Sequence, residues 1–110
     1  MKPNSWRIMW LIVVFDFPTQ TKIERRRYSQ FRKRLLEEGF LQMQFSVYIR
    51  NTPTFSIANS LALKLGRTVP EKGKCSFLFL TDKQYGLTVN FYGKKKEKTE
   101  KEPQQLLLFS

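Results

Sequence analysis

The chain is short, strongly basic and free of histidine. Its 110 residues include 20 Lys and Arg against 9 Asp and Glu, which gives a formal charge of +11. The absence of histidine excludes Ser-His-Asp and Cys-His catalysis and His-ligated zinc. With 41% hydrophobic and 15% aromatic residues, the chain is predicted to fold as one domain rather than to be disordered. We expect a basic surface that binds a polyanion, of which nucleic acid is the most natural.

Two features of the sequence indicate in which cellular compartment the protein is expected. The longest apolar run, residues 8–15, is far shorter than the roughly 20 residues of a transmembrane helix, and no cleavage site typical of a secretory signal accompanies it. Cys75 is the single cysteine, so no intrachain disulfide can form, which favours a reducing compartment. We therefore expect a cytoplasmic protein with no membrane association.

The first two elements are predicted from residues 8–38. The branched and aromatic run 8–15 indicates a strand buried on both faces, and Asp16 follows it directly. Thr21 and Glu24 match a capping box, so a helix is expected over residues 22–38. Gly39 is suited to the left-handed conformation that ends a helix.

This expected helix has one apolar and one basic side. At about 100° per residue, Tyr28, Phe31 and Leu35 share a stripe that should face the core. The basic residues on the other side are the candidate nucleic-acid contacts: Arg26, Arg27, Lys33 and Arg34. A merely solvated helix face is the alternative reading of such a cluster.

The remaining elements alternate strand and helix. Residues 40–50 read as a strand, bent or split near Gln44, and a helix with Pro53 in its first turn should run to Gly66. Its core stripe is expected to comprise Phe55, Ala58, Leu61, Ala62 and Leu65. Strands are expected at 76–81 and 87–92, joined by a turn at 82–86. This order predicts an α+β fold, a ferredoxin-like sandwich with two helices on one face of an antiparallel sheet.

The C-terminal part differs in composition. We expect a ferredoxin-like domain over residues 1–93, a charged linker over 94–105, and a C-terminal strand over 106–110. The apolar residues 106–109 cannot form a core alone. Folding back onto the domain, pairing with the sheet edge of a second molecule, and fraying are the three alternatives.

Asp16 is the best-placed carboxylate for chemistry. The other acidic residues fall in the linker, in turns or loops, or at helix ends, whereas Asp16 ends a buried strand. Capping of the following segment is its alternative role. Cys75 is expected to be a core residue and not a nucleophile, because no histidine can activate it. Mg²⁺ is commonly held by one or two carboxylates, so a symmetric dimer that paired two copies of Asp16 could bind it and hydrolyse phosphodiesters.

Several segments together resemble a known family. They are WLIVVFDFPT at 10–19, the basic helix ending in EGF at 38–40, QFSVYIR at 44–50, FLFLT at 77–81 and QLLLF at 105–109. In this order and spacing, they resemble the small CRISPR-associated endonuclease of the spacer-acquisition machinery, the partner of the CRISPR-associated integrase. The similarity covers residues 6–109, and the ending at 103–109 looks most like the type II systems.

The resemblance implies a function in antiviral defence. It implies a homodimer in which the C-terminal strand joins the partner's sheet, and it places the family's catalytic and metal-binding residue at Asp16, with Mg²⁺ as cofactor. RNA or double-stranded DNA would be cleaved, and the dimer would bridge integrase dimers and hold protospacer DNA. Ser46 and Tyr48 match a motif near the dimer site, although outward-facing strand residues would look the same.

Three functions remain open from the sequence. The first is a Mg²⁺-dependent endonuclease, and the second is a non-catalytic DNA-binding scaffold of the integration complex. Phosphate binding by Lys and Arg fits both. The third, an RNA-binding ferredoxin-like module, is disfavoured because Phe77, Phe79 and Phe91 are expected to face the core.

Overall fold

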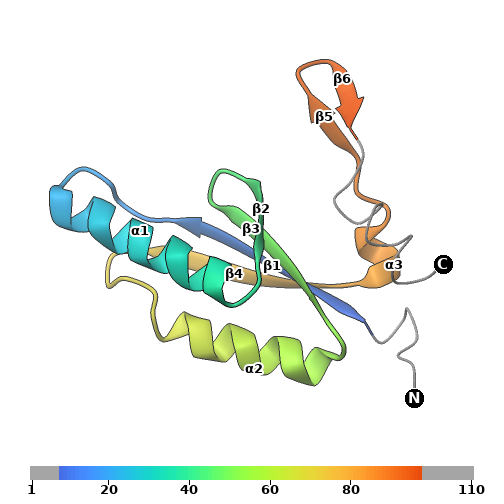
Figure 1. The fold of residues 1–110 in the computed structure, drawn as a ribbon, viewed down its shortest axis with the longest axis horizontal. Helices are drawn as coiled ribbons and strands as arrows, with labels where there is room; N and C mark the ends of the chain where they lie inside the picture. The colour runs from blue at the N-terminus through green and yellow to red at the C-terminus, as the bar shows by residue number, and fades with distance from the viewer. Residues whose placement is uncertain (1–7, 98–110) are drawn as a thin grey trace.

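A computed structural model describes residues 8–97 and contains a four-stranded antiparallel sheet (Figure 1). Its strands are β1 (Met9–Asp16), β2 (Leu41–Gln44), β3 (Val47–Thr52) and β4 (Lys74–Thr81). Their spatial order is β2-β3-β1-β4, with β1 antiparallel to both β3 and β4. Each helix therefore connects two strands that have another strand between them, which is the ferredoxin-like arrangement predicted from the sequence.

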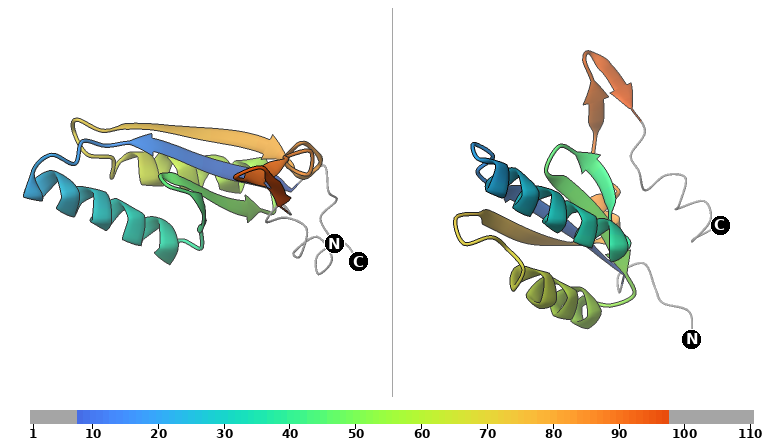
Figure 2. Two further views of the ribbon diagram at one scale, coloured as in Figure 1. Left: turned by 90° about the horizontal axis from the view of Figure 1, so that it is seen from above. Right: turned by 60° about the vertical axis from the view of Figure 1, so that its left-hand side comes forward.

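Helices α1 (Lys22–Glu37) and α2 (Phe55–Gly66) cover one face of this sheet (Figure 2). Alternate β1 residues Leu11, Val13 and Phe15 point into the layer between sheet and helices. The helices contribute Phe31, Leu35, Ala58, Leu61, Ala62 and Leu65 to the same cluster. Two expected members of the stripes differ: Tyr28 is half-buried, and Phe55 is 52% exposed, at the start of α2 beside Phe79.

The termini of α1 follow the sequence signals closely. Thr21 and Glu24 form both hydrogen bonds of the capping box. At the other end Gly39 has φ 86°, and the amides of Gly39 and Phe40 donate to the carbonyls of Leu36 and Leu35. In α2 the cap is Thr54, so Pro53 precedes the helix instead of occupying its first turn.

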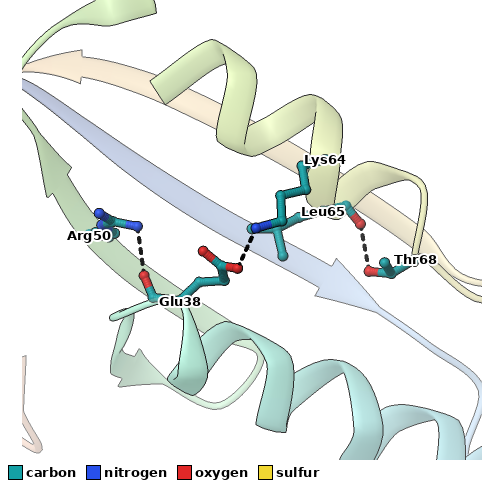
Figure 3. A network of polar contacts seen from close by, with 5 residues as sticks. All are labelled: Glu38, Arg50, Lys64, Leu65 and Thr68. Atoms are coloured by element: carbon teal, nitrogen blue, oxygen red, sulfur yellow. Dashed lines mark hydrogen bonds and ion pairs between the residues drawn. The ribbon is translucent and has the colours of Figure 1, made fainter. Parts of the chain in front are cut away.

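A polar network fastens the C-terminal end of α1 to β3 and α2 (Figure 3). The Arg50 guanidinium donates to the Glu38 carbonyl at 2.7 Å, and Lys64 Nζ lies 2.7 Å from Glu38 Oε1. The hydrogen bond from Lys64 lowers the pKa of the Glu38 carboxyl. Within α2's last turn and the loop after it, Thr68 Oγ1 donates to the Leu65 carbonyl at 2.7 Å.

The opposite face of the sheet carries a second, smaller core. Residues 82–86, expected as a turn, instead contain the short helix α3 (Asp82–Tyr85) with its own capping box from Thr81 and Gln84. Tyr85 stacks on Trp10 at 4.2 Å between ring centroids, and Trp10 Nε1 donates to Asp82 Oδ1 at 2.8 Å. Asp82 is therefore buried, at 3% exposure, rather than a solvated turn residue.

The strand predicted over residues 87–92 is wrong in place and length. Residues 87–92 do not join the main sheet; β5 (Asn90–Tyr92) pairs only with β6 (Lys95–Glu97) in a hairpin beyond α3 (Figure 1). Phe91, expected to face the core, is 62% exposed because no other described element covers this hairpin. Residues 95–97 of the expected linker thus form a strand, while the rest of the linker after 97, and the segment 106–110, lie outside the described residues. Within residues 8–97, no helix has the length and apolar character needed to cross a membrane.

Candidate functional site

Asp16 is the last residue of β1 and lies on the sheet face opposite α1 and α2. Side chains alternate along a strand, so Asp16 shares its face with Val14 and Ile12, while Phe15 points to the helices. Its carboxylate is exposed and makes no hydrogen bond or ion pair with any residue in the range 8–97. Because Thr21 caps α1, Asp16 does not have the alternative capping role.

The hairpin turn between β2 and β3 holds the end of β1 from one side. Phe45 and Ser46 form this turn, which confirms the predicted split of strand 40–50. Ser46 has φ 60°, and its carbonyl accepts a hydrogen bond from the Phe15 amide at 3.1 Å. Its hydroxyl lies 3.0 Å from Tyr28 Oη. Ser46, whose positive φ strains the backbone, is thus hydrogen-bonded to Phe15, the residue before Asp16.

Aromatic rings fix the residues on both sides of Asp16. Phe15 and Phe17 contact each other at 4.9 Å between centroids, and Tyr28 contacts both of them. On the far side, Gly73 approaches the Phe17 ring so closely that a Cβ there would lie 2.5 Å from a ring carbon. Only glycine fits this position without displacing Phe17. The sequence offered no signal for this contact, since it depends on how β4 pairs with β1.

The structure separates the two motif residues Ser46 and Tyr48. Ser46 lies at the turn near Asp16, whereas Tyr48 is fully buried among the helix-facing core residues, so it is not an outward-facing strand residue. Burial raises the pKa of the Tyr48 hydroxyl, and the positive charge of Arg32 opposes that rise. Tyr48 is therefore a neutral core residue at physiological pH.

The four candidate basic residues lie on exposed positions of α1: Arg26, Arg27, Lys33 and Arg34. Arg27 lines a hollow that Phe17 and Pro18 also line, and the other three do not line that hollow. Arg25 is occupied otherwise, donating to the carbonyls of Thr19 and Gln20 at 3.1 Å. Of the four candidates, Arg27 thus lies beside Phe17, the residue that follows Asp16.

Cys75 lies on β4, and its environment suits a structural role. Burial raises the pKa of the Cys75 thiol to about 11. We expect alkylation by iodoacetamide at pH 8 to be about 200-fold slower than for a free thiol, because the thiolate fraction is that much smaller. The rate should increase about tenfold per pH unit up to the pKa and reach that of a free thiol in urea. Rapid labelling of the folded protein at pH 8 would contradict the buried environment.

The donor set around Asp16 suits a hard, water-rich cation better than a protein-caged one. Among residues 8–97, no three His, Cys, Asp or Glu side chains gather in a way that could hold a metal ion. Mg²⁺ commonly takes one or two carboxylates and keeps several waters, so a single exposed Asp per chain is compatible with it, particularly if a second copy supplies another. Zinc, which usually takes three or four protein ligands from Cys, His and carboxylate side chains, does not fit the single carboxylate at this site within residues 8–97.

Fold and site together define a small ferredoxin-like protein with a basic helix and one exposed carboxylate at a strand end. The sequence model of the family described as CRISPR associated protein Cas2 matches residues 9–87. A protein of Flavobacterium psychrophilum named CRISPR-associated endoribonuclease Cas2 is 44% identical over 106 residues, covering 96% of this chain and 92% of its own. One from Parvibaculum lavamentivorans with the same name is 44% identical over 101 residues, covering 92% and 100%. The chain belongs to the Cas2 family.

Proposed function

We propose that this protein is a Mg²⁺-dependent endonuclease of a CRISPR system, acting on RNA or double-stranded DNA, and that Asp16 is its catalytic residue. The observation that carries the proposal is the exposed carboxylate at the end of β1, which has no hydrogen-bond or ion-pair partner among residues 8–97. The contacts of Phe15, Phe17 and Tyr28 hold the backbone on both sides of it. The relatives named endoribonucleases add support. When bound, Mg²⁺ would supply charge neutralisation at a phosphodiester oxygen and an acidified water. Asp16 would hold the ion, and the basic helix would hold the substrate.

The open face of the sheet favours a homodimer that brings two Asp16 side chains together. Val14 and Leu78 are 39% and 48% exposed on the same face as Asp16. An isologous contact over this face would cover those apolar side chains and place each Asp16 near its symmetry mate. The β5–β6 hairpin and Leu87 before it add apolar surface that residues 8–97 leave uncovered, with Leu87, Phe91 and Tyr92 exposed by 62% or more.

The segment 106–110 would strengthen this dimer by pairing with the partner's β4. Strand β4 is an edge of the four-stranded sheet, and beside it lies an apolar groove lined by Leu63, Phe77 and Phe79. Deleting residues 106–110 is expected to weaken the dimer at least tenfold, because four apolar side chains lose their cover. Light scattering across a dilution series measures this, with the double variant Gln104→Ala/Gln105→Ala as control. An equally stable dimer after the deletion would contradict strand exchange.

Binding of protospacer DNA and of a CRISPR-associated integrase extends the proposal to spacer acquisition. The charge of +11 and the exposed basic residues of α1 support nucleic-acid binding whether or not the protein is catalytic. A non-catalytic scaffold of the integration complex is therefore the second candidate function, favoured by the same surface.

Two assays on the same proteins test the proposal. Cleavage of labelled RNA and duplex DNA is measured with and without Mg²⁺, and spacer integration is measured with the cognate integrase, each for the wild type and Asp16→Ala. Loss of both activities supports a catalytic role in integration. If Asp16→Ala loses cleavage but retains integration, the protein acts in integration as a non-catalytic scaffold. If Asp16→Ala cleaves as the wild type does, Asp16 has no part in the cleavage mechanism.

A further inference from the structure

Two neighbouring hollows form a groove between α1 and the loop before β4. One, of about 330 Å³, has apolar walls from Phe17, Pro18 and Ile23. The other, of about 230 Å³, is lined by Gln30, Arg34 and Thr68. Arg27 and Pro70 line both, so the two hollows adjoin each other. The groove starts beside Phe17, the residue after Asp16, and runs along α1 towards its C-terminal half.

The lining of the groove divides the basic residues of α1 into two sets. Arg27, Gln30 and Arg34 fall within about 60° of one another around the helix. Arg26 and Lys33 lie about 80° further round and line neither hollow. All four cations are exposed. The two pairs therefore carry the same charge on exposed positions of one helix but differ in position, because only Arg27 and Arg34 line these two hollows.

The two hollows differ in chemistry in a way that matches the parts of a nucleotide. The smaller hollow holds two arginines and no carboxylate, which suits phosphate groups. The larger one has apolar walls, and its two carboxylates, Glu24 and Glu71, are balanced by Arg27 and Lys72. It therefore has no excess positive charge for phosphates, while its carboxylates can accept hydrogen bonds from base amino groups. The larger hollow adjoins Phe17, so the base-binding end of the groove lies at the Phe17 end.

We infer that this groove binds one single strand of nucleic acid, with its phosphates on Arg27 and Arg34 and a base in the hollow beside Phe17. A duplex cannot enter hollows of this size, which are each about as large as the site for one small ligand. A duplex would instead rest on the outer surface, where Arg26 and Lys33 would contribute equally. The inference rests on the proposed nucleic-acid binding and specifies both its place and the strandedness of the ligand.

Paired charge variants of the full chain test the groove. A fluorescein-labelled 12-nucleotide single-stranded RNA is titrated by fluorescence anisotropy in EDTA, so that cleavage does not intervene. Arg27→Gln/Arg34→Gln should reduce the affinity at 0.1 M salt about 20-fold and the slope of log K against log salt by about 1.4, since each single-strand phosphate contact contributes about 0.7. Arg26→Gln/Lys33→Gln removes the same charge and should change the affinity less than threefold.

A second matched pair adds charge instead of removing it. Gln30→Glu places a carboxylate in the groove and should weaken binding several-fold, whereas Ser29→Glu, on an exposed position outside it, should not. Circular dichroism confirms that each variant is folded. Equal losses for the inner and outer variants, no binding of the single strand by the wild type, or the same inner-only losses with a 24-base-pair DNA duplex would overturn the inference. Unchanged cleavage by Asp16→Ala would reject the catalytic proposal and leave this binding result standing.

Discussion

Asp16→Ala is expected to lower Mg²⁺-stimulated cleavage at least about 100-fold while leaving the fold intact. The carboxylate is exposed and has no hydrogen-bond partner within residues 8–97, so its removal leaves no buried group unsatisfied. Its loss would remove the protein's hold on the ion, whose stabilisation of transition-state charge amounts to several kcal/mol, and each 1.36 kcal/mol corresponds to a tenfold change in rate. Single-turnover cleavage of labelled RNA, with melting temperature as the structural readout, measures both effects.

The controls for Asp16 separate a metal role from a general loss of negative charge. Glu37→Ala removes an exposed acid from α1 and should leave cleavage unchanged. Chelation of Mg²⁺ in the wild type should reduce the rate to that of Asp16→Ala, and chelation should have no further effect on the variant. Residual Mg²⁺-stimulated cleavage by pure Asp16→Ala, at a rate close to that of the wild type, would show that another group holds the metal.

The parts of the fold that were predictable have local causes. Strand β1 and helix α1 were identified because a continuous apolar run, a capping box and a helix-ending glycine all lie within short segments. The same capping box occurs at Thr81 and Gln84, yet α3 was read as a turn because four residues are too few to show a helical period. A predicted turn gives no reason to expect a buried acid, yet Asp82 is buried and accepts a hydrogen bond from the Trp10 indole N–H.

The parts that were not predictable depend on pairing between distant segments. The alternation of Leu87, Val89 and Phe91 predicts a strand with all three on one face, and Phe91 is expected to face the core, but all three are more than half exposed. Alternation predicts that a face will be covered and does not say by which chain. The frame around Asp16 likewise depends on register: Ser46 meets Phe15 only because Gln44 pairs with Val47 across a two-residue turn. No asparagine or glycine marks that turn in the sequence.

Asp82→Ala is expected to destabilise the protein by about 3 kcal/mol, because it leaves the buried Trp10 indole N–H without its acceptor. Both side chains are almost fully buried, at 3% and 1% exposure, so water cannot replace the lost hydrogen bond. For a domain of this size, the melting temperature should fall by about 15 °C at fixed protein concentration. Urea unfolding followed by Trp fluorescence gives the free energy directly.

Two further variants show whether the loss of stability in Asp82→Ala comes from the lost hydrogen bond or from a change in helix α3. Lys83→Ala changes an exposed residue of the same four-residue helix and should alter stability by less than about 0.5 kcal/mol. Asp82→Asn retains an acceptor oxygen for the Trp10 indole and should lose about 1 kcal/mol, well short of the alanine variant. If Asp82→Ala were no less stable than Lys83→Ala, the contact between α3 and the open face of the sheet would contribute little. The β5–β6 hairpin that follows α3 would then not depend on this contact for its attachment to the sheet.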